Sequence, residues 1–233
     1  MTARYYCSNL TDNKVTLSQA ESHHAIHVMR VSEGDTIILF DGHGTTAEGQ
    51  IRNITRRDVS VEVVSRQTHT RPTGELHILA APPKGDRLRW MIEKLTELGV
   101  TAFRPLTTAR SVRQGANRSN EKLNAAVIEA AKQCGRNWLM EVGEPMTLDE
   151  ACSMAAESDH RILVAHPSGD SFSPSGSQQK TTMLIGPEGG FSEDEINLLR
   201  QVGVVIVSWP GHILRTETAA ITFAALALSE ATP

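Results

Sequence analysis

The stretch "IGPEGGFSEDE", from Ile185 to Glu195, has the residue types of a ligand-binding loop between a strand and a helix. Its glycines allow positive backbone φ angles and a close approach of the backbone to a ligand. Such a turn ordinarily holds a phosphate at the N-terminus of the following helix. Here Glu188 lies in the turn and the acids from Glu193 to Glu195 open the helix, so an anion would be repelled. The loop therefore predicts a neutral or cationic ligand, and a tight capped turn that binds nothing is the alternative.

A second stretch with reactive side chains is "PGHILRTETAA", from Pro210 to Ala220. A guanidinium such as that of Arg215 stabilises negative charge that develops during a reaction. A carboxylate such as that of Glu217 accepts a proton. The following segment is apolar nearly all round as far as Leu228, which predicts a helix buried on more than one side. Either this helix belongs to the core alone or it is shared between the core and a dimer interface.

Other motifs point away from several classes of site. No G-x-x-x-x-G-K-[ST] occurs, and no G-x-G-x-x-G follows a strand. His23, His24 and His27 form an H-H-x-x-H run without the Glu of H-E-x-x-H, so packing or RNA contact is expected and no metal. Cys134 has the chemistry of a nucleophile for carbon-5 pyrimidine methylation, but the sequence provides no base in evident reach, so we expect a core or surface thiol.

The composition of the whole chain sets the class of protein. The chain has 233 residues and a net charge of −4, which excludes a globally basic nucleic-acid binder but not local basic patches. Its three cysteines include no C-x-x-C, which fits a reducing compartment. No apolar run approaches the roughly 20 residues of a membrane span, and the N-terminus lacks the apolar run of a signal peptide. We expect a cytoplasmic protein with no membrane association.

The first 70 residues predict a small β-barrel. Strands are expected at "TIILFDG", "TTAEGQIRNI" and "DVSVEVVSR", because short β-prone runs alternate with turn residues. One helix is expected at "SQAESHHAIHVMR", with Ser18 as N-cap and Glu21 completing a capping box. The segment from Gln67 to Glu75 contains Pro72 and Gly74 and is interpreted as the linker between two domains, 1–70 and 75–233.

From residue 75 onward, strands and helices alternate. Strands are expected at "LHILAAP", "VTAFRPL", "RILVAHP", "TTMLIGP" and "GVVIVSW", and "PSGDSFSPSGSQQK" is expected to be a polar loop. Helices are expected at "DRLRWMIEKLTELG", "SNEKLNAAVIEAAKQCG", "TLDEACSMAAE", from Ser192 to about Val202, and at "TETAAITFAALALSEA". The first of these has Leu88, Ile92, Leu95 and Leu98 on one face and stops at Gly99. Repeated strand–helix units predict an α/β domain with a mostly parallel sheet covered on both faces, in which ligands bind beyond the carboxyl ends of the strands.

The two loops together resemble the signature loops of SPOUT methyltransferases. The resemblance is closest to the ribosomal RNA small subunit methyltransferase E family, which methylates N3 of a uridine. The stretches "HHAIHVMRVSEGD", "KGDRLRWMIEKLTELGVTAFRPL", "TARSV" and "IEAAKQCGR" agree with it in the same order, so the resemblance covers nearly the whole chain. His212 is a departure, because the family often has Arg or Lys after this glycine.

The resemblance implies a C-terminal domain that threads into a trefoil knot, an N-terminal PUA-like RNA-binding β-barrel and a homodimer. It also implies S-adenosylmethionine as methyl donor, a sulfonium cation without phosphate, which suits an acidic glycine loop. The implied catalytic residues are Arg215, with Glu188 or Glu217 as proton acceptor, and their order stays open. The implied donor-binding residues are Val164, Ala165, Ile185, Gly186, Gly189, Gly190, Trp209, Gly211, Ile213, Leu214, Thr218 and Ala219.

Local clusters of arginine favour RNA as the partner. Between Gly99 and Asn120 every charged residue is an arginine, and "RNITRR" adds another cluster. Such clusters follow phosphates, although for any single arginine a solvated surface is the alternative. The residues expected to contact RNA are Arg4, Arg30, Arg110, Arg113 and Arg136.

With this resemblance, the sequence predicts an S-adenosylmethionine-dependent methyltransferase that acts on N3 of a uridine in 16S ribosomal RNA. Whether the substrate is free RNA or the assembled small subunit stays open. One alternative is a non-catalytic RNA-binding or ribosome-assembly factor with the same fold. Another is an enzyme of the same superfamily that methylates the ribose of transfer RNA.

Overall fold

The computed structural model describes residues 2–111, 120–157, 159–173 and 180–229. These residues form two compact units, one made of residues 1–71 and 128–139, the other of residues 72–127 and 140–233. The first unit therefore takes in a segment from the middle of the chain that the proposed boundaries at 70 and 75 leave in the second domain. Among the described residues, no helix has the length and apolar character needed to cross a membrane.

The first unit is built on a five-stranded sheet with the order β1-β3-β4-β5-β2. Its strands are β1 (Arg4–Tyr6), β2 (Lys14–Thr16), β3 (Thr36–Phe40), β4 (Thr45–Ile54) and β5 (Val59–Thr68). β1 runs parallel to β3, and the other neighbours are antiparallel. The three strands expected from the sequence are present, and alternate residues of β3, β4 and β5 are buried around Tyr5 and Leu17.

The helix expected near residue 18 is divided. It consists of α1 (Gln19–His23) and a π-helical stretch (His24–Met29), which ends at Arg30 with a left-handed φ of 53°. Ser18 caps α1, because its Oγ accepts from the backbone N–H of Glu21 at 3.3 Å. The capping box is wrong, however, since both carboxylate oxygens of Glu21 accept instead from Lys132 Nζ, each at 3.0 Å.

The second unit is an α/β domain. Its sheet has the order β12-β10-β11-β6-β7-β8, with β9 beside β7, and every pair is parallel. The strands are β6 (Leu76–Ala80), β7 (Ala102–Thr107), β8 (Glu141–Val142), β9 (Met146–Thr147), β10 (Arg161–Ser171), β11 (Thr181–Ile185) and β12 (Val205–Ser208). The helices are α2 (Asp86–Leu98), α4 (Leu148–Glu157), α5 (Glu193–Gln201) and α6 (Thr216–Leu228). Residues 120–127 of α3 (Asn120–Cys134) belong to this unit and residues 128–134 to the first.

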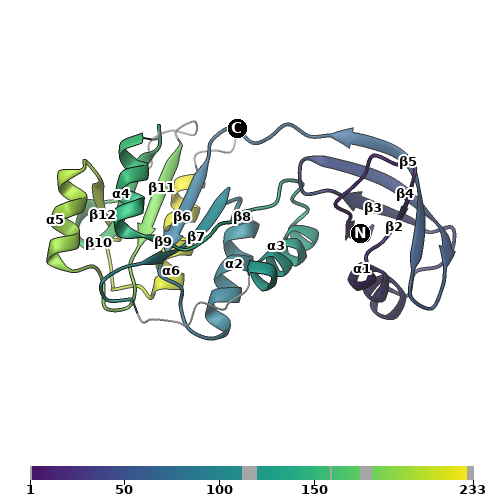
Figure 1. The fold of residues 1–233 in the computed structure, drawn as a ribbon, viewed down its shortest axis with the longest axis horizontal. Coiled ribbons are helices and arrows are strands. Elements are labelled where there is room, and N and C mark those ends of the chain that lie inside the picture. The colour runs from purple at the N-terminus through teal and green to yellow at the C-terminus, as the bar shows by residue number, and fades with distance from the viewer. Residues whose placement is uncertain (1, 112–119, 158, 174–179, 230–233) are drawn as a thin grey trace. The chain divides into compact units, whose positions relative to one another are not determined.

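Helices cover both faces of this parallel sheet, as the alternation of elements predicts (Figure 1). α4 and α5 share one core cluster with Leu79, Val164 and Leu184. α6 packs on α2 and contacts β6 and β11. In β6 and β11 nearly every residue is buried, instead of every second one, which is typical of a sheet covered on two sides.

Two local expectations in this unit are wrong. β10 continues through Pro167 to Ser171, where a polar loop was expected, although its register with β12 shifts between Ala165 and Asp170. Gly169 lies in this irregular stretch. A larger residue would not fit there, because a Cβ would come within 2.6 Å of the backbone of Ile206. On α2, Leu98 is 36% exposed and Met91 completes the buried face instead.

Candidate functional site

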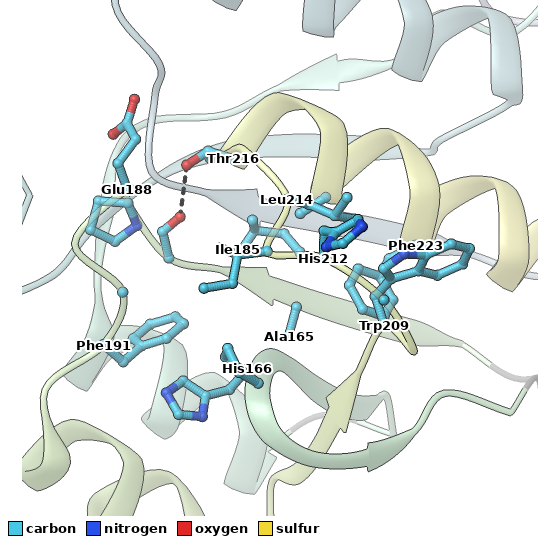
Figure 2. Close-up of a pocket in the computed structure, with 17 residues that line it drawn as sticks. Ala165, His166, Ile185, Glu188, Phe191, Trp209, His212, Leu214, Thr216 and Phe223 are labelled. Carbon is cyan, nitrogen blue, oxygen red and sulfur yellow. Dashed lines mark hydrogen bonds between the residues drawn. The ribbon is translucent and has the colours of Figure 1, made fainter.

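A pocket of about 210 Å³ opens where three neighbouring strands end (Figure 2). β10 contributes Ala165 to Pro167 from within the strand, and β11 and β12 contribute the loops that follow Ile185 and Ser208. The first turns of α6 close the pocket with Thr216, Ala219 and Phe223. The lining residues are Ala165, His166, Pro167, Ile185, Gly186, Pro187, Glu188, Gly190, Phe191, Trp209, Gly211, His212, Ile213, Leu214, Thr216, Ala219 and Phe223. The pocket thus joins the two loops that the sequence singled out.

The acidic glycine loop is held by local hydrogen bonds. Gly190 takes a left-handed φ of 67° and donates its N–H to the carbonyl of Pro187 at 2.8 Å. Ser192 and Glu195 then form a reciprocal capping box that starts α5. Phe191 turns inward beneath Gly186, where an added Cβ would meet its ring at 2.9 Å. The loop is therefore a tight, capped turn and also one wall of a pocket, so its two interpretations are not exclusive.

A direct hydrogen bond connects the two loops. Thr216 Oγ1 donates to the carbonyl of Gly186 at 3.0 Å, which Figure 2 marks with a dashed line. Thr216 is buried in the first turn of α6, and Arg215 is the N-cap residue whose carbonyl accepts from Ala219. The start of α6 is thereby fixed against the end of β11, which holds the pocket walls at a constant spacing.

Two of the predicted catalytic carboxylates share one cation. Nη1 of Arg87 lies 3.2 Å from Glu217 Oε1 and 3.6 Å from Glu188 Oε1. Glu217 is 4% exposed, and its Oε2 is buried without a hydrogen-bond partner among the described residues. Glu188 is exposed and lines the pocket. Sequence reasoning missed Arg87, although it stands in the stretch "KGDRLRW" that carried part of the resemblance.

Arg215 is the predicted catalytic residue that lies apart from these groups. It is exposed at the N-cap of α6 and is not among the residues that line the pocket. The structure thus brings Glu188 and Glu217 together through Arg87, and leaves the side chain of Arg215 at the surface beside the pocket wall formed by Leu214 and Thr216.

Most of the expected donor-binding residues line the pocket. Three do not: Val164 is fully buried in the core, while Gly189 and Thr218 are exposed. The carbonyl of Gly189 instead accepts from Arg110 Nη1 at 2.8 Å. The residues brought together are Ala165, Ile185, Gly186, Gly190, Trp209, Gly211, Ile213, Leu214 and Ala219.

The arginines expected to contact RNA have different surroundings. Arg4 Nη2 donates to Asn137 Oδ1 at 2.9 Å, and burial lowers the pKa of Arg136 to about 10, so it stays charged at neutral pH. Arg110 binds backbone carbonyls of the glycine loop. Arg30 is exposed, and Arg113 lies outside the described residues.

The histidines and the cysteine weighed for other chemistry lie in the first unit. The rings of His23 and His27 are 4.5 Å apart on the exposed side of the divided helix. Cys134 is an exposed thiol at the end of α3, as one of the expected alternatives has it.

The chemistry of the pocket fits a sulfonium donor better than a phosphate. Among the described residues, its lining contains no Lys or Arg and includes the Glu188 carboxylate, while Ile185, Leu214 and Phe223 present apolar surface. Burial, and to a smaller extent the charge of Arg200, lowers the pKa of His166, which favours the neutral form of this lining imidazole. Apolar walls suit an adenosyl group, and a carboxylate suits a cation.

Comparison with known proteins agrees with this geometry. Residues 69–228 match the RNA methyltransferase domain family, and residues 17–64 match the RNA methyltransferase PUA domain. The chain therefore belongs to a class of RNA methyltransferases with an N-terminal PUA domain.

Relatives narrow this class. The chain is 31% identical to the ribosomal RNA small subunit methyltransferase E of Bacillus subtilis, over 88% of this chain and 85% of the relative. It is 32% identical to the protein of that name from Synechocystis sp., over 88% of this chain and 69% of the relative. The chain belongs to the ribosomal RNA small subunit methyltransferase E family. A solved methyltransferase from Legionella pneumophila, in complex with the bound cofactor SAM, is 30% identical, with a TM-score of 0.88 over 98% of both chains.

Proposed function

We propose that the protein transfers a methyl group from S-adenosylmethionine to N3 of a uridine in small-subunit ribosomal RNA. The observation that carries this proposal is the pocket in which both signature loops meet, with apolar walls, a carboxylate and no Lys or Arg among the described residues that line it. A bound donor supplies a methyl group already activated by a sulfonium, so we propose no metal in the transfer step. The B. subtilis and Synechocystis relatives carry names that agree with ribosomal RNA as substrate.

The pocket residues hold the donor in this proposal. Ile185, Leu214 and Phe223 pack on its adenosyl part, and the backbone of Gly186 and Gly190 lies open to its polar groups. Apart from its chain neighbours, no atom of the described residues lies within 4 Å of the position of a Cβ on Gly190, which leaves space for a ligand beside it. The Thr216–Gly186 hydrogen bond keeps the two walls in place, which supports positioning, the main requirement for a direct methyl transfer.

The acceptor nitrogen must lose its proton. N3 of uracil then forms a bond to the methyl carbon while the carbon–sulfur bond breaks and its electron pair stays on sulfur. Glu188 is the better proton acceptor, because it is exposed, lines the pocket and lies farther from Arg87, at 3.6 Å, whereas Glu217 is buried at 3.2 Å from the same Nη1. Arg215 stabilises the negative charge that spreads onto the uracil carbonyls as the proton leaves.

The partners follow from the same proposal. The PUA-like unit of residues 1–70 contacts the RNA, and domain 75–233, threaded as a trefoil knot, carries the chemistry in the cytoplasm, where ribosomal subunits are made. A homodimer is supported by α6, since Ile221, Ala225 and Leu228 form a half-buried apolar stripe beside its buried face. Ile213 is 88% exposed beside the pocket and gives a second apolar surface for a partner copy.

Two measurements test the proposal. Donor should raise the melting temperature of ligand-free protein, and Gly190→Asp should abolish the shift by adding charge and filling the space beside the backbone. Mass spectrometry of nucleosides from ribosomal RNA should show N3-methyluridine only in cells that contain the protein. An unchanged melting temperature at millimolar donor favours a non-catalytic RNA-binding factor, and loss of a ribose methylation in transfer RNA favours the other alternative.

A further inference from the structure

Three potential metal ligands converge on the side of the second unit that lies away from the pocket. A carboxylate oxygen of Glu75 and one ring nitrogen each of His77 and His160 all lie within 4.8 Å of one another. Glu75 directly precedes β6, His77 lies on β6, and His160 directly precedes β10. These are the amino ends of the parallel strands, whereas the pocket lies at the carboxyl ends of β10, β11 and β12.

The geometry points to a binding site for a divalent transition-metal ion, Zn²⁺ first, held by Glu75, His77 and His160. Two imidazoles and one carboxylate are a donor set that zinc takes, with water as fourth ligand. Bonds of about 2.0–2.2 Å in a tetrahedron put the ligand atoms about 3.4 Å apart. Glu75 Oε2 and His160 Nε2 are already 3.6 Å apart, and the three ligand atoms lie within 4.8 Å of one another, so side-chain rotations that draw them together would complete the site.

A buried hydroxyl orients one of the imidazoles. His160 Nδ1 lies 3.1 Å from the Oγ1 of Thr182, which is fully buried on β11 between the other two strands. This contact leaves His160 Nε2 facing Glu75, and such a partner on the second ring nitrogen is typical of zinc-bound histidine. The His160 side chain is only 9% exposed, and its ring lies 4.5 Å from that of His77. The imidazoles are therefore held near each other by the sheet.

The neighbouring cations do not compete for this position. Arg104, whose charge acts on His77, pairs with Glu141 at 3.2 Å. Lys180 pairs with Asp159 at 3.1 Å, next to His160 in sequence. A bound ion would connect the residues at the amino end of β6 with the residue before β10, on either side of β11. It would thereby stabilise the amino ends of these three strands.

The alternative is a carboxylate–imidazole pair without a metal, and calorimetry distinguishes the two. Full-length protein is stripped with chelator and titrated with ZnCl₂. We expect one zinc per chain, a rise in melting temperature, and the visible absorption of tetrahedral Co²⁺ when cobalt replaces zinc. His77→Ala and Glu75→Gln should each weaken zinc binding at least about 100-fold, and Thr182→Val about 10-fold, the scale for loss of an orienting contact.

A matched control uses the other histidine pair. His23→Ala combined with His27→Ala removes two exposed imidazoles 4.5 Å apart in the first unit and should leave zinc binding unchanged. Circular dichroism in chelator should show that each variant is folded. Absence of zinc binding at micromolar concentration, or full binding in folded His77→Ala, would overturn the proposal. The site does not rest on the proposed function, because donor binding and methylation are measured without zinc.

Discussion

Glu217 is a buried carboxylate that depends on Arg87 for its charge partner. Its Oε1 lies 3.2 Å from Arg87 Nη1, and its Oε2 has no hydrogen-bond partner in the described part of the chain. When one partner of a buried ion pair is removed, the other charge stays buried without compensation. The resulting loss of folding free energy is larger than the contribution of an exposed ion pair. Because the Arg87 side chain is 38% exposed, water offsets part of that cost.

Arg87→Ala should therefore lower the free energy of unfolding by about 1–3 kcal/mol, measured by urea denaturation without donor. Arg87→Lys should recover part of the loss. Lys94→Ala is a matched control on the same helix, because Lys94 pairs with Glu97 at the surface and its loss should cost less than about 0.5 kcal/mol. Equal losses for Arg87→Ala and Lys94→Ala would contradict a special role for the buried carboxylate.

Arg215 lies beside the pocket rather than in its lining. A substitution at Arg215 can therefore test catalysis without removing a residue that lines the donor pocket. If its guanidinium stabilises charge that appears only as uracil N3 loses its proton, it acts in the transition state. Arg215→Ala should then lower single-turnover methylation by roughly 10²–10³-fold at saturating donor and RNA. Donor affinity by calorimetry should change little, since the pocket walls remain.

Arg215→Lys serves as the conservative variant. It should recover only part of the rate, because a point charge does not reproduce a planar guanidinium. Near-normal turnover in Arg215→Ala, or loss of activity that follows loss of donor binding, would show that the assigned role is wrong.

Helices α1 and α3 are joined in the first unit by a buried ion pair. The side chains of Glu21 and Lys132 are 7% and 8% exposed, and both Glu21 oxygens accept from Lys132. Burial raises the pKa of Glu21, and Lys132 opposes that rise. Without Lys132 the ionised form of Glu21 loses its compensation, so the pKa in the folded state rises further.

Lys132→Met should lower the free energy of unfolding by about 3–5 kcal/mol at pH 7, the scale for breaking a buried pair. A folded-state pKa above the unfolded value means that folding favours the protonated acid. The loss in the variant should therefore shrink as pH falls through the raised pKa and below the ordinary value of 4.5, because Glu21 is neutral in both states only well below that value.

Denaturation of wild type and variant at several pH values measures this difference. In the double variant Lys132→Met, Glu21→Gln, the acid is absent, so the pH dependence of the difference should disappear. A difference that stays constant with pH in Lys132→Met alone would mean that packing, not charge, dominates the contact.

The sequence predicts those elements whose cause lies within a few residues. Capping boxes are present at Thr147–Glu150 and Ser192–Glu195, where cap and partner stand three positions apart in the sequence. Glu21 has the same spacing from Ser18, yet it bonds to a lysine 111 positions away. Local patterns do not show when a distant partner competes for a side chain.

In the candidate site, too, the features with a local sequence signal could be predicted and the long-range contacts could not. Both loops of the pocket could be found from their glycines and charges, while the contact of Arg87 with Glu217 spans 130 positions and has no local signal. The continuation of β10 past Pro167 depends on its pairing with β12, which a polar run of residues does not indicate. Roles in catalysis and RNA binding stay predictions.

For the whole molecule, the apolar stripe on α6 predicts assembly. Ile221, Ala225 and Leu228 recur at helical spacing and stay half-buried in the single chain. Ile221→Lys should place a charge in the proposed dimer interface and shift micromolar protein from dimer to monomer in light scattering. Val202→Lys, at an exposed position after α5, is the control and should leave the dimer intact. Monomeric wild-type protein at that concentration would rule out the homodimer.

The charge of the whole molecule decides where RNA can bind. Because the net charge is −4, attraction to phosphate must come from local exposed cations. In the first unit Arg4 and Arg136 are engaged internally, whereas Arg30, Arg56 and Arg57 are exposed. Each phosphate contact that is lost lowers the slope of log affinity against log salt by about 0.7–0.9.

Arg30→Ala should therefore weaken RNA binding about 3–10-fold at moderate salt and reduce that slope by about one contact, while single turnover at saturating RNA stays near wild type. Titrations at several salt concentrations measure both effects. Arg52→Ala is the matched control, because Arg52 already pairs with Glu62 at 2.6 Å and should leave the slope unchanged. An equal change of slope in the two variants would mean that the overall positive charge, rather than a contact at Arg30, attracts the RNA. An unchanged slope in Arg30→Ala would mean that the RNA binds elsewhere on the protein.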